Sequence, residues 1–221
     1  LTLAKGMRQK HPNIEIVFIA NKLPPSLEGV LSQSNFPLIT LPFNIDSAHW
    51  NQKDDAIAST TMLAAYFQTQ TPAIDLLIVD HYYLDITWQK LLKTTYKKLL
   101  VIDDLANRQH CANYLLDQTI ARQPEAYVNL VPSSCHLLLG QRFMLLRNEF
   151  IQLIAKAKIK RQQTTKINNI LLNLGGVDLN NTTLDLIEAV SYYRKVSKHL
   201  DLKLAIVLTS YSPHVEVIKK L

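Results

Sequence analysis

The sequence predicts an α/β protein made of two doubly wound lobes with mostly parallel sheets, the second lobe much shorter than the first. Short apolar segments alternate with segments of helical periodicity along most of the 221 residues. Some apolar segments, such as residues 76–79, contain no polar residue, as is typical of parallel strands covered on both faces. The alternation pauses over residues 151–166, which are rich in Lys and Gln, and then resumes. This pause indicates a boundary between two lobes.

The first lobe is expected to occupy residues 1–150. Residues 14–19 are rich in β-branched side chains, which favours a strand, and a Pro-Pro-Ser sequence opens a helix at residue 24. Small and apolar residues recur along residues 52–68 at the spacing of one helix face. The sequence therefore predicts strands at 14–19, 36–41, 75–79, 98–102, 114–116 and 136–139, and helices at 24–34, 52–68 and 84–95.

The second lobe is expected to begin at residue 167 and to run to residue 221. Residues 151–166 contain neither Gly nor Pro, so we expect a helix there that runs into a linker. The sequence then predicts strands at 167–174 and 202–208, and helices at 181–197 and from Pro213 onward. The chain starts at Leu1 in what looks like the middle of an amphipathic helix, so we expect it to be cut from a longer protein.

The charge pattern argues against several classes of partner. Lys and Arg total 24 against 18 Asp and Glu, a formal net charge of +6, but the basic residues are scattered. The densest cluster lies within residues 156–166 and has no aromatic residues in it. We expect a solvated helix face or linker there, with attraction of an anionic ligand as the alternative. No membrane span is expected, since no apolar run approaches the roughly 20 residues that a span needs. No nucleic-acid partner is expected, because no zinc-finger, RNA-recognition or helix-turn-helix spacing occurs. No obligate protein partner is expected either.

The cysteines bear on compartment and on metal binding. Cys111 and Cys135 are the two cysteines of the sequence, and they form no C-x-x-C pair. This pattern favours neither a disulfide framework nor a thiolate zinc site, and it suits a reducing compartment, so we expect a cytoplasmic protein. Neither a metal nor a cofactor is expected. A G-x-S-x-G motif is also missing, which argues against a serine hydrolase.

Polar residues gather at the predicted end of the strand at 75–79. Asp80, His81 and Tyr82 offer a carboxylate, an imidazole and a phenol at the sheet edge where parallel α/β proteins bind their ligands. His81 could act as a general base that Asp80 orients. The alternative is that Asp80 caps the next helix while the two rings pack at the sheet edge. We favour function, because three polar groups at one strand end need partners.

Two further strand ends carry candidate residues. Asp103 and Asp104 follow the strand at 98–102, and adjacent side chains point to opposite sides. We therefore expect at most one of them in the cleft and the other to cap the following segment. Gly175, Gly176 and Asp178 precede a predicted helix, which suits a phosphate cradle at a helix N-terminus. A tight turn with Asn180 or Asn181 as the helix cap is the equally open alternative.

Several ordered motifs resemble one family, the UDP-2,4-diacetamido-2,4,6-trideoxy-β-L-altropyranose hydrolases of pseudaminic acid biosynthesis, which feed surface glycans. The resemblance spans residues 1 to about 180 and weakens beyond them. The matching segments are 79–82, Trp88, 101–105, 108–111, 115–117, 138–140, 143–150 and 174–178.

The resemblance implies a glycosyltransferase-like GT-B fold, similar to the UDP-N-acetylglucosamine transferase of lipid II synthesis, with the UDP-sugar between the lobes and the nucleotide mainly on the second. It implies metal-independent attack of water at the anomeric carbon with inversion, which releases UDP and 2,4-diacetamido-2,4,6-trideoxy-L-altrose. Tyr82 falls at the position of the family's substrate-side tyrosine, with His81 and Asp80 as its neighbours. Expected contacts to substrate or nucleotide come from Gly175, Gly176, Asp178, Asn180 and Asp103.

The sequence departs from the family pattern in two places. The family's base lies in a Gly-x-Gly-His-x-x-x-Arg loop before the helix that corresponds to residues 1–5, and this sequence has no such loop. The Ser/Glu-rich nucleotide loop late in the second lobe is also missing. We therefore expect the first lobe to lack its first strand and loop, the second lobe to be incomplete, and the chain alone to be inactive. Two alternatives stay open, an inverting GT-B glycosyltransferase with a UDP-sugar donor and an inactive nucleotide-sugar-binding fragment.

Overall fold

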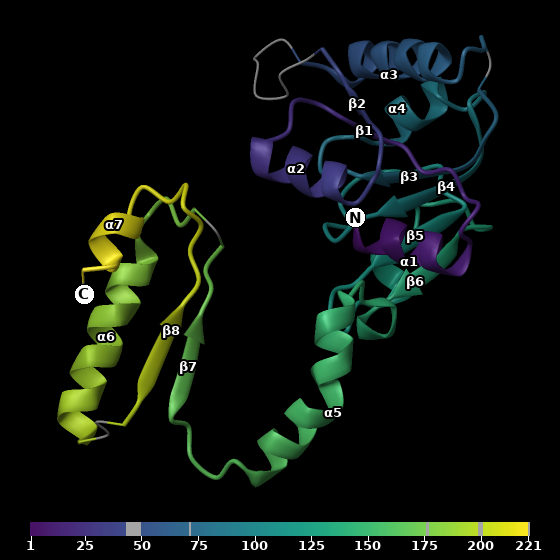
Figure 1. Ribbon diagram of the computed structural model, residues 1–221. Coiled ribbons are helices and arrows are strands. Elements are labelled where there is room, and N and C mark those ends of the chain that lie inside the picture. The colour runs from purple at the N-terminus through teal and green to yellow at the C-terminus, as the bar shows by residue number, and fades with distance from the viewer. Residues whose placement is uncertain (43–49, 71, 176, 199–200, 221) are drawn as a thin grey trace. The chain divides into compact units, whose positions relative to one another are not determined.

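A computed structural model describes residues 1–42, 50–70, 72–175, 177–198 and 201–220 (Figure 1). The chain divides into two compact units, Leu1–Asn148 and Glu149–Leu221, and each is described by itself. Every strand pair in the described ranges is parallel. The predicted α/β class with parallel sheets is therefore confirmed, while the two-lobed GT-B arrangement stays a prediction.

The first unit contains a four-stranded sheet in the order β3-β4-β5-β6 and a separate two-stranded sheet. In the larger sheet, Asp80 is level with Ile102, and Ile102 is level with Leu116. The carboxyl ends of β3, β4 and β5 therefore lie at one edge. The strands are β1 (Phe18–Ala20), β2 (Leu38–Thr40), β3 (Ile74–Asp80), β4 (Tyr96–Ile102), β5 (Tyr114–Asp117) and β6 (His136–Leu139).

Two helices of the first unit, α3 and α4, begin at residues whose side chains cap them. The Asn51 side chain accepts hydrogen bonds from the backbone N–H groups of Lys53 and Asp54 at the start of α3, and Asp85 accepts one from Thr87 at the start of α4. The α-helices are α1 (Thr2–Lys10), α2 (Pro25–Gln33), α3 (Gln52–Tyr66) and α4 (Ile86–Leu91), and two 3₁₀ turns cover Pro124–Tyr127 and Gln141–Phe143.

Several predicted elements of this unit are shorter than expected, and two of them show a physical reason. The strand predicted at 14–19 begins only at Phe18, where the N–H donates to Pro37 O. Pro37 has no N–H to donate in return, so it cannot extend the ladder with β2 toward earlier residues. The helix predicted at 84–95 ends at Leu91, because Thr95 turns back to donate its hydroxyl to Leu92 O. A β-branched threonine suits that turn better than a helix interior.

The main core lies between the central strands and helices α3 and α4. Leu77 and Val79 of β3 and Leu99 and Val101 of β4 are buried there, and Trp88 of α4 packs against them. Ala56 and Leu63 of α3 belong to the same cluster. Burial of each large side chain contributes about 1.5–3 kcal/mol, so this core holds the strand ends in fixed positions.

The second unit is built on one β-α-β crossover. β7 (Asn169–Leu172) pairs in parallel with β8 (Lys203–Ile206), and α6 (Thr182–Ser197) connects them. Helix α5 (Asn148–Gln163) precedes the crossover, and α7 (Val215–Ile218) follows it. The order of elements agrees with the sequence, although β7, β8 and α7 are shorter than predicted. None of the helices in the described ranges is long and apolar enough to cross a membrane.

Candidate functional site

A pocket of about 450 Å³ lies at the carboxyl ends of β3, β4 and β5. This is the edge of a parallel sheet where ligands bind, because the loops that follow the strands diverge there. Each of the three strands contributes side chains. The lining residues are Asp80, His81, Tyr82, Ile102, Asp103, Asp104, Gln118 and Thr119. The pocket thus brings together the Asp80–Tyr82 and Asp103 candidates that lie more than twenty residues apart in the sequence.

In the turn after β3, the Tyr82 side chain is exposed, and a backbone N–H of the turn binds the His81 ring. The N–H of Tyr83 donates to Nδ1 of His81 at 3.1 Å, so the ring carries its own hydrogen on Nε2. Burial lowers the pKa of His81, and the nearby Arg108 charge lowers it further. The Asp55 and Asp80 charges raise the pKa but do not cancel this effect. His81 is therefore a neutral imidazole whose remaining polar atom is an N–H donor. This geometry does not support a base role.

Within the described residues, Asp80 neither caps helix α4 nor forms a hydrogen bond that would orient His81. The residue that caps α4 is Asp85, so the alternative in which Asp80 caps the next helix is wrong. In the described ranges Asp80 makes no hydrogen bond to His81, and its carboxylate borders the pocket. The His81 ring packs instead near Trp50 and Tyr83, with centroid distances of 6.0 and 5.8 Å.

Asp103 and Asp104 both line the pocket, which corrects the expectation that at most one would. The chain turns sharply after Ile102, with Ala106 at φ 49°, so consecutive side chains border the same space. Asp103 closes this turn, since its Oδ2 accepts the Ala106 N–H at 2.9 Å. Asp103 is buried, whereas Asp104 is exposed.

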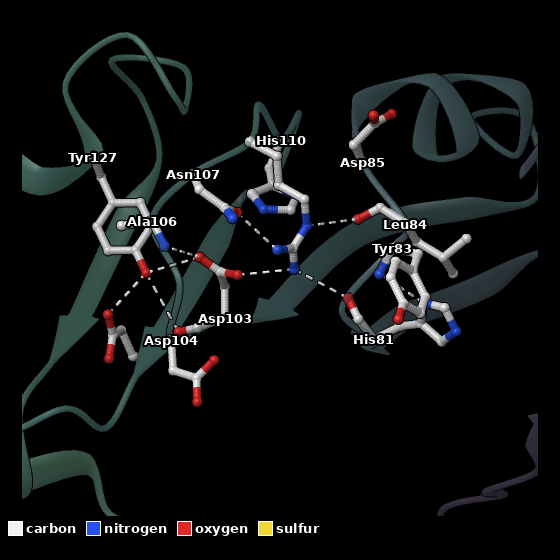
Figure 2. Close-up of polar contacts among 12 residues, drawn as sticks. His81, Tyr83, Leu84, Asp85, Asp103, Asp104, Ala106, Asn107, His110 and Tyr127 are labelled. Carbon is white, nitrogen blue, oxygen red and sulfur yellow. Dashed lines mark hydrogen bonds and ion pairs between the residues drawn. The ribbon is translucent and has the colours of Figure 1, made fainter.

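Arg108 connects the end of β4 to the turn after β3, and Figure 2 labels its partners Asp103, His81 and Leu84. Its Nη2 lies 2.8 Å from Asp103 Oδ1, an ion pair whose angles are not those of a hydrogen bond. The same guanidinium donates from Nη2 to His81 O at 3.0 Å and from Nε to Leu84 O at 3.2 Å. The arginine therefore neutralises a buried carboxylate and fastens both ends of the turn that carries Tyr82.

Tyr127 joins two buried carboxylates behind the pocket. Its hydroxyl lies 3.0 Å from Asp103 Oδ2 and 2.8 Å from Asp117 Oδ2, and Arg122 pairs with Asp117 at 2.5 Å. Burial raises the pKa of Tyr127, and the two carboxylates raise it further. Burial alone would raise the pKa of Asp117, but hydrogen bonds from Thr119, Tyr127 and Arg122 lower it. Asp117 is an ionised anion held by neutral and cationic donors.

The electrostatics of the pocket favour an uncharged ligand. Three carboxylates line it, and in the described part of the chain only that of Asp103 forms an ion pair with a Lys or Arg side chain. The carboxylates of Asp80 and Asp104 accept hydrogen bonds, so O–H and N–H groups suit them, whereas a phosphate would be repelled. The pocket is chemically suited to the hydroxyl and amide groups of a sugar.

The sequence analysis missed Arg108, Tyr127, Asp117, Gln118 and Thr119. Asp117 and the two residues after it follow a predicted strand, so the strand-end rule that selected Asp80 could have found them. Tyr127 ends a 3₁₀ turn and carries no local signal of a role. Arg108 opens one of the segments that resemble the family, but that resemblance assigned it no role.

In the second unit, Asp178 caps helix α6. Its carboxylate accepts the N–H groups of Thr182 at 3.1 Å and Thr183 at 2.8 Å, and these hydrogen bonds lower the pKa of Asp178. The cap expected from Asn180 or Asn181 is therefore supplied by Asp178. Asn181 has a left-handed backbone and makes no side-chain cap. A carboxylate thus holds two of the N–H groups that a phosphate would use.

The predicted glycine turn is present in part. Gly175 has φ 87°, which favours glycine, and its N–H donates to Asn173 Oδ1 at 3.3 Å. Asn180 is exposed, and Gly176 lies outside the described residues. No group of three or more His, Cys, Asp or Glu side chains in the described ranges could hold a metal ion, and Cys111 and Cys135 are free thiols.

Comparison with known proteins gives a distant relative. A UDP-2,4-diacetamido-2,4,6-trideoxy-β-L-altropyranose hydrolase of Campylobacter jejuni is 29% identical over 147 residues, which are 66% of this chain and 48% of the relative. The match therefore spans about half the length of that hydrolase. No family model matches the chain. The chain is distantly similar to a UDP-sugar hydrolase.

Proposed function

We propose that this chain is part of a UDP-sugar hydrolase of pseudaminic acid biosynthesis. The proposed reaction releases UDP and 2,4-diacetamido-2,4,6-trideoxy-L-altrose from the UDP-linked sugar. The observation that carries the proposal is the acidic pocket at the ends of β3, β4 and β5, which suits a sugar and repels a phosphate. The similarity to a hydrolase of that UDP-sugar over 66% of the chain supports the same substrate.

The reaction needs water to attack the anomeric carbon on the face opposite UDP. The water oxygen bonds to that carbon, the bond from carbon to the UDP oxygen breaks, and UDP leaves with the electron pair. Tyr82, whose side chain is exposed at the pocket, is the proposed contact to the sugar, and His81 offers an N–H donor beside it. Asp80 accepts hydroxyl or amide hydrogens of the sugar.

A base must accept the proton of the attacking water. Among the described residues that line the pocket, the one histidine, His81, has its Nδ1 lone pair occupied by the Tyr83 N–H. The proposed base is the histidine of a Gly-x-Gly-His loop before α1 in a longer protein. This proposal rests on the distant similarity to the hydrolase, of which the match covers 48%.

The test uses the full-length protein that contains this chain. It measures UDP release from UDP-2,4-diacetamido-2,4,6-trideoxy-β-L-altropyranose in the absence of any acceptor. Release above background is expected, and its absence would overturn the proposal. Release only with an added sugar or lipid acceptor would indicate a transferase, and UDP binding without turnover a binding fragment.

A matched pair of tyrosines tests the assigned residue. Tyr82→Phe removes a hydroxyl at the pocket and is expected to lower kcat about tenfold or more, with unchanged folding. Tyr83→Phe removes a hydroxyl from the neighbouring ring, which packs near Trp50 and is not part of the lining. Equal rates for the two variants would remove Tyr82 from the mechanism.

A further inference from the structure

Gln118 lines the pocket, but neither the sequence motifs nor the proposed mechanism uses it. It follows Asp117 at the end of β5 and is half-buried. We propose that Gln118 determines specificity by donating a hydrogen bond from Nε2 to the carbonyl oxygen of an N-acyl group on the sugar. This inference rests on the proposed function, in which the sugar occupies this pocket.

The orientation of the Gln118 amide follows from its one backbone contact. The Leu145 N–H lies 2.6 Å from the amide oxygen of Gln118. Because a backbone N–H can only donate, the atom that it meets must be Oε1. The hydrogen bond also ties the end of β5 to the segment after the 3₁₀ turn Gln141–Phe143, which restricts rotation of the side chain. The orientation is thus fixed by chemistry.

The group that Gln118 can still offer to a ligand is therefore a donor. Its Nε2 has no hydrogen-bond partner among the residues that the structure describes. When a ligand displaces water from an amide N–H at the pocket wall and offers no acceptor, binding is weakened by the desolvation cost of that donor. A ligand that fills the pocket must therefore bring an acceptor to Gln118.

The surrounding carboxylates specify the rest of the ligand. Asp104 follows the end of β4 and Gln118 follows the end of β5, the neighbouring strand, and both line the pocket. The pocket thus offers an acceptor-only carboxylate and an amide donor from adjacent strand ends. A secondary amide has the complementary groups, an N–H for the carboxylate and a carbonyl oxygen for Gln118. Anionic acceptors such as phosphate are disfavoured by the carboxylates.

The deciding variant is Gln118→Glu. It keeps the size of the side chain and an oxygen for the Leu145 N–H, but it replaces the Nε2 donor with an acceptor. We expect KM for the diacetamido UDP-sugar to rise about tenfold or more, with a smaller change in kcat. Gln123→Glu is the control, because it makes the same charge change at an exposed residue outside the pocket lining. Urea unfolding of both variants checks the fold.

A binding experiment separates this inference from the proposed function. It compares UDP-N-acetylglucosamine with UDP-glucose, which differ in one N-acetyl group, by calorimetry on the full-length protein. The original protein is expected to bind the N-acetyl sugar about tenfold more tightly, and Gln118→Glu to lose this preference while Gln123→Glu keeps it. Equal or equally absent binding of the two sugars, or a preference that survives Gln118→Glu, overturns the inference. A protein that shows the preference but releases no UDP would overturn only the hydrolase.

Discussion

Replacing Arg108 with Ala removes the cation beside the Asp103 carboxylate. The Asp103 side chain is 0% exposed and that of Arg108 is 13% exposed, so water cannot readily replace the guanidinium. Removing one partner of a buried ion pair costs about 3–5 kcal/mol, because the other charge stays buried. The Ala106 N–H still donates to Asp103, and the Tyr127 hydroxyl is shared between Asp103 and Asp117, which places the expected loss near the lower limit, about 3 kcal/mol.

A second substitution tests whether this loss of stability comes from the buried Asp103 charge. Asp103→Asn in the Arg108→Ala background removes the uncompensated charge. The double variant should then be more stable than the sum of the two single losses predicts, by about 1–3 kcal/mol. If Arg108 acted only by filling space, the two losses would add.

Urea unfolding followed by tryptophan fluorescence is the assay. The sequence has 2 Trp residues, Trp50 and Trp88, and both lie in the first unit, so the signal reports on the unit that contains Arg108. Lys97→Ala is the control, because Lys97 pairs with Asp75 on the surface, where the side chains are 66% and 86% exposed. An exposed pair of this kind contributes less than about 1 kcal/mol. A loss below 1 kcal/mol for Arg108→Ala, or additive losses with Asp103→Asn, would refute the reasoning.

Three further outcomes follow from the same contacts. Tyr127→Phe removes a hydroxyl shared by two buried carboxylates and should destabilise the first unit by about 1.5–3 kcal/mol in the urea assay; an unchanged midpoint would contradict this. Burial lowers the pKa values of His81 and His110 below 6.5, so the unfolded chain takes up protons first and the free energy of unfolding should fall as the pH drops below 6.5. His110→Gln should flatten that dependence, and an equal slope in both proteins would argue against it. Asp178→Ala should speed amide exchange at Thr183 at the start of α6, while Asp178→Asn keeps most of the protection.

The order of helices and strands could be predicted from the sequence because periodicity is a local property. The helix predicted at 24–34 is α2, and the strand predicted at 136–139 is β6 with the same bounds. Strand lengths were less predictable, since a strand lasts only as long as its partner can pair with it. Residues 14–17, which are apolar except for Glu15, continue the strand pattern, but Pro37 cannot donate to them, and β1 starts at Phe18.

The candidate site was predictable in position but not in detail. The strand-end rule led to Asp80, Tyr82 and Asp103, and all three line one pocket. It could not assign which carboxylate is free, because that depends on Arg108, whose guanidinium reaches back to His81 O and Leu84 O. It also could not find the donor of Gln118, because the orientation of that amide is set by the Leu145 N–H, 27 residues away.

The sequence by itself thus determined the α/β class, the succession of elements and the sheet edge that bears the site. These depend on residue spacing along the chain, which a parallel sheet converts directly into position. The tertiary structure alone decided that His81 is a neutral donor, that Asp103 is the pocket carboxylate with an ion pair among the described residues, and that Asp178 caps α6. The physical reason is that charge and hydrogen-bonding capacity depend on neighbours in space. The segment after β4 that carries Asp103 contacts His81 and Leu84 after β3 and Tyr127 after β5, and the sheet brings these segments together (Figure 2).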